Sequence, residues 1–186
     1  LWGQPVDGLR CRWVQPPQRV PVGTAPTVSV EVQNVSAVPR TWQCSNEITW
    51  GLGWPGKSWH EGTTHPKFSV QTGGGVRPAT ARDVELEFGV GRPDTTDEDA
   101  MPGYYYLSPG ARITLTAALP WKLERAGRFI LDACVSRYSP ITNNAIGTMW
   151  MSCPPVVLEA VPQTQPDETG PGLEAPPWGD GAKRAD

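Results

Sequence analysis

The chain has 186 residues, of which 38% are hydrophobic and 19% are charged, both below the averages for soluble globular domains. Its 21 prolines and 20 glycines break helices, which excludes a helical bundle and a doubly wound α/β domain. The longest apolar stretches span only a few residues, so we expect no membrane-spanning helix. The net charge of −3 argues against nucleic acid as the main partner.

Hydrophobic and polar residues alternate in short stretches along the chain, which is the pattern of strands with one buried face. In 27–35, for example, Val28, Val30 and Val32 fall on one face. The same pattern or short apolar runs predict strands at Leu9–Val14, 27–35, 42–50, 84–90, 112–116, 128–136, 148–153 and 156–161. Many short strands with Gly- and Pro-rich connections predict an all-β fold, an immunoglobulin-like antiparallel β-sandwich, over residues 1–161.

Two segments stand apart in composition. Residues 51–80 contain glycine or proline at regular intervals, so we expect long loops at the edge of the sandwich, where function is often located. Residues 162–186 have the composition of an extended, disordered-type tail. We expect Leu173 and Trp178 to anchor this tail on a protein partner.

The four cysteines, Cys11, Cys44, Cys134 and Cys153, show no C-x-x-C spacing. We therefore expect two disulfides and an extracytoplasmic location rather than a zinc site. Strand parity points Cys11 and Cys44 inward and Cys134 outward, and favours the pairs Cys11–Cys44 and Cys134–Cys153. A β-bulge would change this parity, so the other pairings stay open. Because the chain opens directly on polar sequence, we expect a mature or trimmed form.

One glycine-rich segment, 51–58, matches the phosphate-binding pattern G-x-x-x-x-G-K-[ST]. That chemistry requires a helix after the loop, whose first amides bind the phosphate. Residues 59–66 contain Gly62 and Pro66 and do not favour a helix. We therefore predict no nucleotide and no other cofactor.

Two further clusters have residue types that bind metals. His60, Glu61 and His65 resemble the zinc-protease pattern H-E-x-x-H, but the second histidine comes one residue too late. Carboxylates in one short loop are typical ligands of Ca²⁺, although the spacing of an EF-hand is absent. The candidate Ca²⁺ ligands are Asp94, Asp97, Glu98 and Asp99. Runs of charge are usually solvated, so we assign no metal.

Nine tryptophans are many for a chain of this length. Trp42 and Trp50 lie in strand-like sequence and are expected in the core. Trp54 and Trp59 lie among glycines and are expected to be exposed, where tryptophan either stacks on sugar rings or anchors a protein interface. The sequence has no G-x-S-x-G motif, and its two histidines lie within six residues of each other, so we predict that the protein is not an enzyme.

Several motifs resemble immunoglobulin-like extracytoplasmic domains of environmental bacteria, a group similar to the intracellular proteinase-inhibitor-type β-sandwich family. They are Trp2-Gly3-Gln4-Pro5-Val6-Asp7-Gly8-Leu9-Arg10, Leu107-Ser108-Pro109-Gly110 with Ile113-Thr114-Leu115, Ala126-Gly127-Arg128-Phe129-Ile130-Leu131, and the segment from Trp150 through Leu158. The resemblance covers about two-thirds of residues 1–161 and implies the sandwich fold. It carries over no functional residue.

The sequence therefore predicts a secreted or periplasmic interaction module, a non-catalytic accessory or structural subunit of a larger envelope or extracellular assembly. Trp54, Trp59, Leu173 and Trp178 are its predicted partner-binding residues. Two alternatives stay open. One is a carbohydrate-binding module that binds polysaccharide through exposed tryptophans, and the other is a proteinase inhibitor-like domain.

Overall fold

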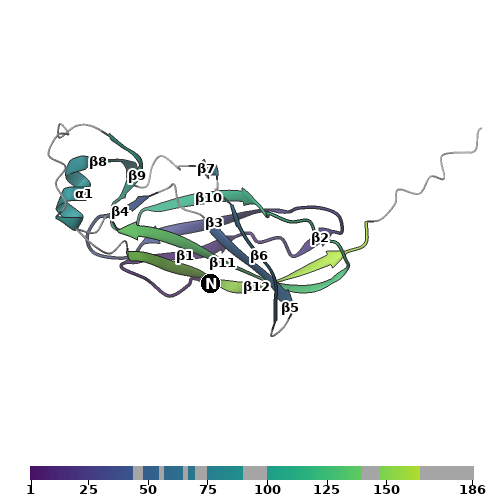
Figure 1. The fold of residues 1–186 in the computed structure, drawn as a ribbon. Helices are drawn as coiled ribbons and strands as arrows, with labels where there is room; N and C mark the ends of the chain where they lie inside the picture. Colours follow the sequence, from purple (N-terminus) through teal and green to yellow (C-terminus); the bar gives the residue numbers. More distant parts are fainter. Residues whose placement is uncertain are drawn as a thin grey trace, which may run out of the picture.

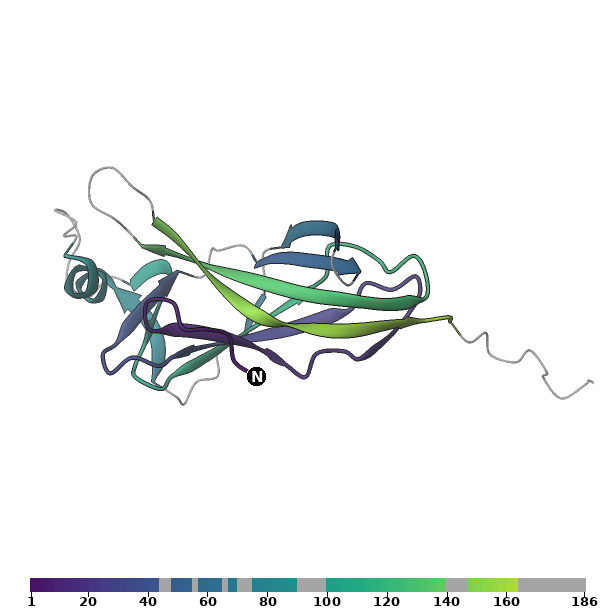
Figure 2. The same ribbon diagram turned by 90° about the horizontal axis from the view of Figure 1, so that it is seen from below.

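The structure is a computed structural model, and it describes residues 1–43, 48–54, 57–64, 67–69, 75–89, 100–139 and 147–163. Most of the described residues are in strands, which lie in two facing sheets and a small third sheet at one end (Figures 1 and 2). The elements are β1 (Leu9–Val14), β2 (Arg19–Pro21), β3 (Thr27–Asn34), β4 (Arg40–Gln43), β5 (Ile48–Trp54), β6 (Lys57–Thr64), β7 (Lys67–Ser69), β8 (Val76–Thr80), α1 (Ala81–Phe88), β9 (Ala100–Leu107), β10 (Arg112–Ala118), β11 (Gly127–Ser139) and β12 (Gly147–Val161).

The strand order confirms the predicted sandwich. The first sheet has the order β1-β3-β10-β7 and the second has the order β2-β12-β11-β5-β6. With the edge strand β2 set aside, these are the A-B-E-D and G-F-C-C′ strand orders of immunoglobulin domains. Neighbouring strands are antiparallel except β2, which runs parallel to β12. The third sheet, β4-β9-β8, is built from the connections between β3 and β5 and between β7 and β10.

The core forms where the alternating hydrophobic residues of the two sheets face each other. In the first sheet Val30 of β3 lies opposite Trp13 of β1 and Leu115 of β10, and all three are buried. In the second sheet the inward positions of β11 are Phe129, Leu131, Ala133 and Val135, all buried. Alternation thus places one apolar face of each sheet against the other, as the sequence predicts.

A bulge in β12 interrupts this alternation. Leu131 pairs with Val156 and Ala133 pairs with Cys153, so Pro154 and Pro155 together oppose the single residue Asp132. Proline has no amide hydrogen for the ladder and is tolerated at such bulges. The bulge exchanges the two faces of β12: even-numbered residues face the core after it, and Met151 and Cys153 face the core before it.

The prediction of a strand at 84–90 is wrong, because residues 81–88 form helix α1. The Thr80 hydroxyl accepts a hydrogen bond from the Asp83 amide, and the Asp83 carboxylate accepts one from the Thr80 amide, which is a capping box. Gly89 ends the helix in the left-handed conformation, with φ 68°. These caps outweigh the alternation of Val84, Leu86 and Phe88. The helix packs on β4, β8 and β9 at the end of the sandwich (Figure 1).

The described part of residues 51–80 is mostly strand, whereas the sequence predicts long loops there. β6 is the outer strand of the second sheet, and β7 is the outer strand of the first. Gly51 faces Asp132 of β11, where a Cβ atom would lie 2.0 Å from the carboxylate Oδ1, so glycine lets the strands pair beneath this side chain. Lys57–Thr64 is a strand, so no helix follows Ser58 to bind phosphate.

Candidate functional site

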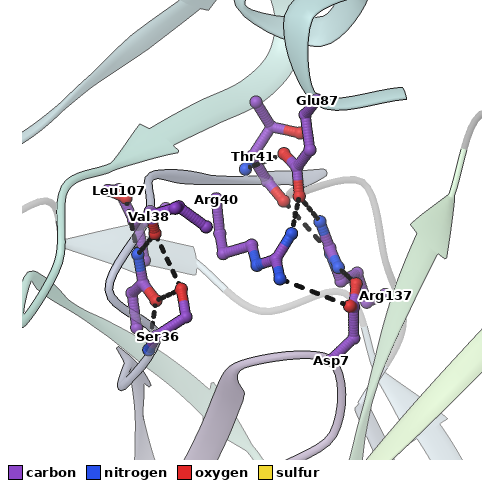
Figure 3. A network of polar contacts seen from close by, with 9 residues as sticks. Asp7, Ser36, Val38, Arg40, Thr41, Glu87, Leu107 and Arg137 are labelled. Carbon is purple, nitrogen blue, oxygen red and sulfur yellow. Dashed lines mark hydrogen bonds and ion pairs between the residues drawn. The ribbon is translucent and has the colours of Figure 1, made fainter. Parts of the chain in front are cut away.

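A cluster of four charged residues lies where α1 and the small sheet meet the end of the sandwich. We call Asp7, Arg40, Glu87 and Arg137 the four-charge cluster (Figure 3). The four residues come from an N-terminal turn, β4, α1 and β11. The cluster therefore joins four segments that are far apart in the sequence.

Asp7 is positioned by a tight two-residue turn. Val6 and Leu9 exchange both backbone hydrogen bonds, at 2.7 and 3.0 Å, and Asp7 and Gly8 between them have φ angles of 46° and 76°. Positive φ at both central positions is that of a type I′ turn, which Asp-Gly sequences favour. The turn presents the Asp7 carboxylate to Arg137 and to Arg40.

Arg137 continues the inward-facing series of β11 beyond Val135 and is only 1% exposed. Its Nη1 donates to Asp7 Oδ2, its Nη2 donates to Glu87 Oε1, and its Nε donates to the carbonyl of Thr41 at 3.1 Å. A buried guanidinium is tolerated only when its donors are satisfied in this way. Arg137 therefore ties the core strand β11 to the N-terminal turn, to β4 and to α1.

Glu87 ties α1 to the end of the sandwich by hydrogen bonds and ion pairs. Its carboxylate accepts hydrogen bonds from the Thr41 amide, from Arg137 and, at 3.4 Å, from Arg40 Nη1. Arg40 Nη2 lies 3.6 Å from Asp7 Oδ1 and closes the ring of charges. The two arginines and two carboxylates balance, so the cluster is formally neutral.

Asn34 fixes the loop that leads to Arg40. Its amide nitrogen donates to the carbonyls of Val38 and Leu107, at 2.9 and 3.0 Å, and its Oδ1 accepts from the amide and hydroxyl of Ser36. The fully buried Asn34 side chain thereby replaces the hydrogen bonds that water would otherwise make to this turn. The loop between β3 and β4 is held against the end of β9.

Burial shifts the pKa values within the cluster in opposite directions for acid and base. Burial raises the pKa of Glu87 against the hydrogen bonds from Thr41 and the charge of Arg40. Burial also lowers the pKa of Arg137 to about 10, which still leaves it protonated at neutral pH. Outside the cluster, in the first turn of α1, a hydrogen bond from Arg77 lowers the pKa of Asp83 to about 2. The Arg77 guanidinium also lies 4.0 Å from the centre of the Tyr106 ring.

A groove of about 430 Å³ lies beside this cluster, between α1 and strands β4 and β9. We call it the α1 groove. Its lining combines apolar side chains with charged and hydroxyl groups: Val38, Pro39, Arg40, Thr41, Asp83, Leu86, Glu87 and Tyr106. Leu86 is 76% exposed and Val38 is 51% exposed, so two large apolar side chains at the groove face solvent. Exposed apolar side chains gathered at a concave surface are typical of binding sites.

Two buried polar atoms at this groove have no hydrogen-bond partner in the described part of the chain. They are Arg40 Nε, a donor, and Thr41 Oγ1, which can donate or accept. Among the described residues, no three His, Cys, Asp or Glu side chains lie close enough together to bind a metal ion. The exposed side chains of Leu86 and Val38 can therefore supply apolar contacts to an occupant of the groove.

The structure separates the cysteines of one predicted pair, Cys134 and Cys153. Cys11 and Cys153 both face the core with their Sγ atoms 3.3 Å apart, whereas Cys134 lies on the other face of the second sheet, with Sγ 3.4 Å from Ser152 Oγ. The prediction that Cys134 pairs with Cys153 is wrong, because the bulge at Pro154 and Pro155 turns Cys153 inward. All three are free thiols in the structure. Cys44, and with it the predicted pair Cys11–Cys44, lies outside the described residues.

Of the other predicted partner-binding residues, Trp54 and Trp59 lie on the paired antiparallel strands β5 and β6. Trp54 ends β5 and Trp59 lies in β6, and only their backbone is described. The remaining candidates fall outside the described residues: Leu173, Trp178, Asp94, Asp97, Glu98, Asp99 and His65. Trp42 is buried in the core, as predicted, and its Nε1 donates to the Ser136 carbonyl at 3.2 Å.

Sequence reasoning missed the four-charge cluster. Two signals point to parts of it: Arg137 continues the odd-numbered inward positions of β11, and Asp7-Gly8 between Val6 and Leu9 is a turn sequence. Glu87 has no such signal, because the alternation of residues at 84–90 predicts a strand. Among the described residues, no helix has the length and apolar character needed to cross a membrane.

No protein family's sequence profile matches this chain, and no curated protein matches it. Among solved structures it is similar to the major subunit of aggregative adherence fimbriae type I from Escherichia coli. The similarity has a TM-score of 0.31 and 14% identity, and covers 81% of this chain and 95% of that one. At this level the similarity carries no functional argument, and the fold assignment rests on the strand order described above.

Proposed function

We propose that this protein is a non-catalytic interaction module of an extracytoplasmic assembly, and that the α1 groove receives an extended segment of a protein partner. The observation that supports the proposal most directly is the exposure of Leu86 and Val38 at the α1 groove. An extended peptide can cover these two side chains with apolar side chains of its own.

The charge of the site supports a peptide over a strongly charged ligand. Arg40 and Arg137 are already matched by Asp7 and Glu87, so a free phosphate or ammonium group would find no unbalanced charge at this position. The helical wall of the groove is also held in place, because Glu87 of α1 accepts hydrogen bonds from Thr41 of β4 and Arg137 of β11. An anchored wall reduces the conformational entropy that binding would otherwise cost.

A pair of matched variants tests this proposal. We expect Leu86→Glu to reduce recovery of the partner at least tenfold when the tagged full chain is used to isolate complexes from its source. Val157→Glu serves as the control, since Val157 is 50% exposed on β12 and lies outside the groove. Chemical crosslinking of the wild-type complex, followed by mass spectrometry, should place the partner's crosslinks on residues 82–87. Equal recovery by both variants, or crosslinks confined to other surfaces, would contradict the proposal.

The tail belongs to the same proposal. If Leu173 and Trp178 anchor the tail on the partner, a chain without residues 162–186 should lose the complex and keep its melting temperature. A large decrease in the melting temperature would instead mean that the tail stabilises the sandwich itself.

A further inference from the structure

Cys11 and Cys153 form a buried contact between the two sheets. Cys11 lies on β1 of the first sheet and Cys153 on β12 of the second, 142 positions later. Their exposures are 0% and 2%, and their Sγ atoms are 3.3 Å apart. The two residues are therefore neighbours only because the sheets close on each other.

The backbones of β1 and β12 approach closely around this contact. Cys11 Sγ lies 3.4 Å from the Met151 carbonyl, and Trp13 Nε1 donates to the Pro154 carbonyl at 2.7 Å. Gly3 lies beside both strands, since its amide donates to the Cys11 carbonyl and a Cβ at this position would lie 2.0 Å from the Ser152 carbonyl oxygen. Side chains of β1 thus reach the main chain of β12 directly, without a layer of other residues between them.

We propose that Cys11 and Cys153 form a disulfide that joins the two sheets at this edge of the sandwich. A disulfide bond is about 2.05 Å long, so the sulfur atoms need to approach by a little over 1 Å. Rotation about the two side-chain torsions supplies a movement of this size. The bond replaces the present thiol–thiol hydrogen bond.

The bond forms by thiol–disulfide exchange with a small-molecule or protein disulfide. The first cysteine thiolate attacks the oxidant's S–S bond and releases one thiol. The second cysteine then attacks the mixed disulfide and releases the other thiol. Two protons leave the cysteines, and the two electrons reduce the oxidant's disulfide to two thiols.

The folded core is a poor place for this reaction. The hydrogen bond to Cys11 and burial both raise the pKa of Cys153, which keeps it in the unreactive thiol form. We therefore expect the bond to form during folding, before the sheets exclude the oxidant. Once formed, it is protected from reducing agents by the same burial.

Cys134 is separated from this pair by the sheet itself. It lies opposite Ser152, with its side chain on the other face of the sheet from Cys153. Cys134→Ser is therefore a matched control that leaves the proposed bond intact. Cys44 is the other cysteine that could form a disulfide with Cys11 or Cys153, so the experiment has to identify which cysteines are linked.

The test is oxidative refolding of the full chain, from denaturant, in a glutathione redox buffer, with a parallel sample refolded in dithiothreitol. Pepsin digestion at low pH without reductant suppresses exchange and preserves the bonds for mass spectrometry. We expect a linked peptide pair that contains Cys11 and Cys153, and that is lighter by two hydrogens than the separate peptides. A link from Cys11 or Cys153 to any other cysteine or to glutathione, or the recovery of both as free thiols, would overturn the proposal.

The melting temperature gives a second readout. A disulfide between Cys11 and Cys153 closes a loop of 142 residues. The oxidised protein should therefore melt at a temperature on the order of 10 °C higher than the reduced protein. Cys134→Ser should keep this difference. Cys11→Ala and Cys153→Ala should each abolish it while folding in both buffers, because alanine leaves only a small cavity. A difference that persists in the two alanine variants would assign it to another bond.

Discussion

Arg137 on β11 and Glu87 on α1 are joined by a hydrogen-bonded ion pair in which both side chains are buried, at 1% and 8% exposed. The pair links the central strand of the second sheet to a helix that lies in the connection between β7 and β10. It gives the end of the sandwich a fixed shape, and the α1 groove depends on that shape.

Removing the Arg137 charge should be strongly destabilising. Arg137→Met leaves Asp7 and Glu87 in the same buried cluster with only Arg40 to balance them. Breaking a buried pair in this way costs about 3–5 kcal/mol of unfolding free energy, measured by urea denaturation at pH 7. Arg128→Gln is the control on the same strand, where an exposed arginine should change the value by less than about 0.5 kcal/mol. Equal stability of the two variants would contradict the assigned role.

The capping residue Asp83 should contribute stability at neutral pH that is lost in acid. Hydrogen bonding by Arg77 lowers the folded-state pKa of Asp83 from the ordinary 3.8 to about 2. A lowered acid pKa means that the contribution is present above pH 4 and disappears as the pH falls towards 2. We expect Asp83→Asn to lose roughly 1–2 kcal/mol at pH 7, reduced by the solvent exposure of Arg77.

Urea denaturation of wild type and Asp83→Asn at a series of pH values checks this dependence. The difference between them should become smaller between pH 4 and pH 2. Glu85→Gln on the same helix is the control, since Glu85 is exposed and takes no side-chain part in the capping box. A difference that stays constant down to pH 2 would mean that the Asp83 charge is not its source.

Gly3 should resist replacement by any residue with a Cβ atom. In Gly3→Ala the new atom would lie 2.0 Å from the Ser152 carbonyl oxygen and 3.3 Å from that of Cys11, and main-chain atoms cannot rotate away. Overpacking of this kind costs about 1–3 kcal/mol of unfolding free energy. Leu1→Ala, at a fully exposed position in the same segment, should have no measurable effect. If Gly3→Ala were as stable as wild type, the N-terminal segment would not lie against β12.

A substitution at Gly89 should change stability only through the backbone conformation of the helix C-cap, because a new side chain there meets no other atoms. A Cβ atom at Gly89 has no neighbour within 4 Å, but the φ of 68° is strained for other residues. We expect Gly89→Ala to lower the unfolding free energy by about 1 kcal/mol. Gly89→Asn should lose less, because asparagine tolerates this conformation better, and the order of the two variants is the informative result.

Several elements could be predicted from the sequence because their cause is local. β1 has the predicted bounds, and β3, β10 and β11 lie where the alternation of residues places them. Burying one face of each strand requires only a period of two, which is visible in a single sequence. The same criterion gave a strand at 84–90, where a capping box from Thr80 and Asp83 and the terminal Gly89 decide for a helix.

The position of Cys153 shows what a local pattern leaves open. The alternation of β12 is interrupted by two prolines, and only the pairing with β11 shows that they form a bulge. A shift of one residue moves every side chain beyond it to the other face of the sheet. The residue that Cys11 contacts across the two sheets therefore depends on the register of β12 around Cys153, 142 residues away.

The sequence by itself determined the sandwich, because strand formation follows from alternation and the resulting apolar faces have to be buried together. Only the tertiary structure decided the four-charge cluster, the α1 groove and the Cys11–Cys153 contact. Each of these joins residues from different elements, and their energies depend on distance and burial. Neither quantity is encoded in the spacing of residues along the chain.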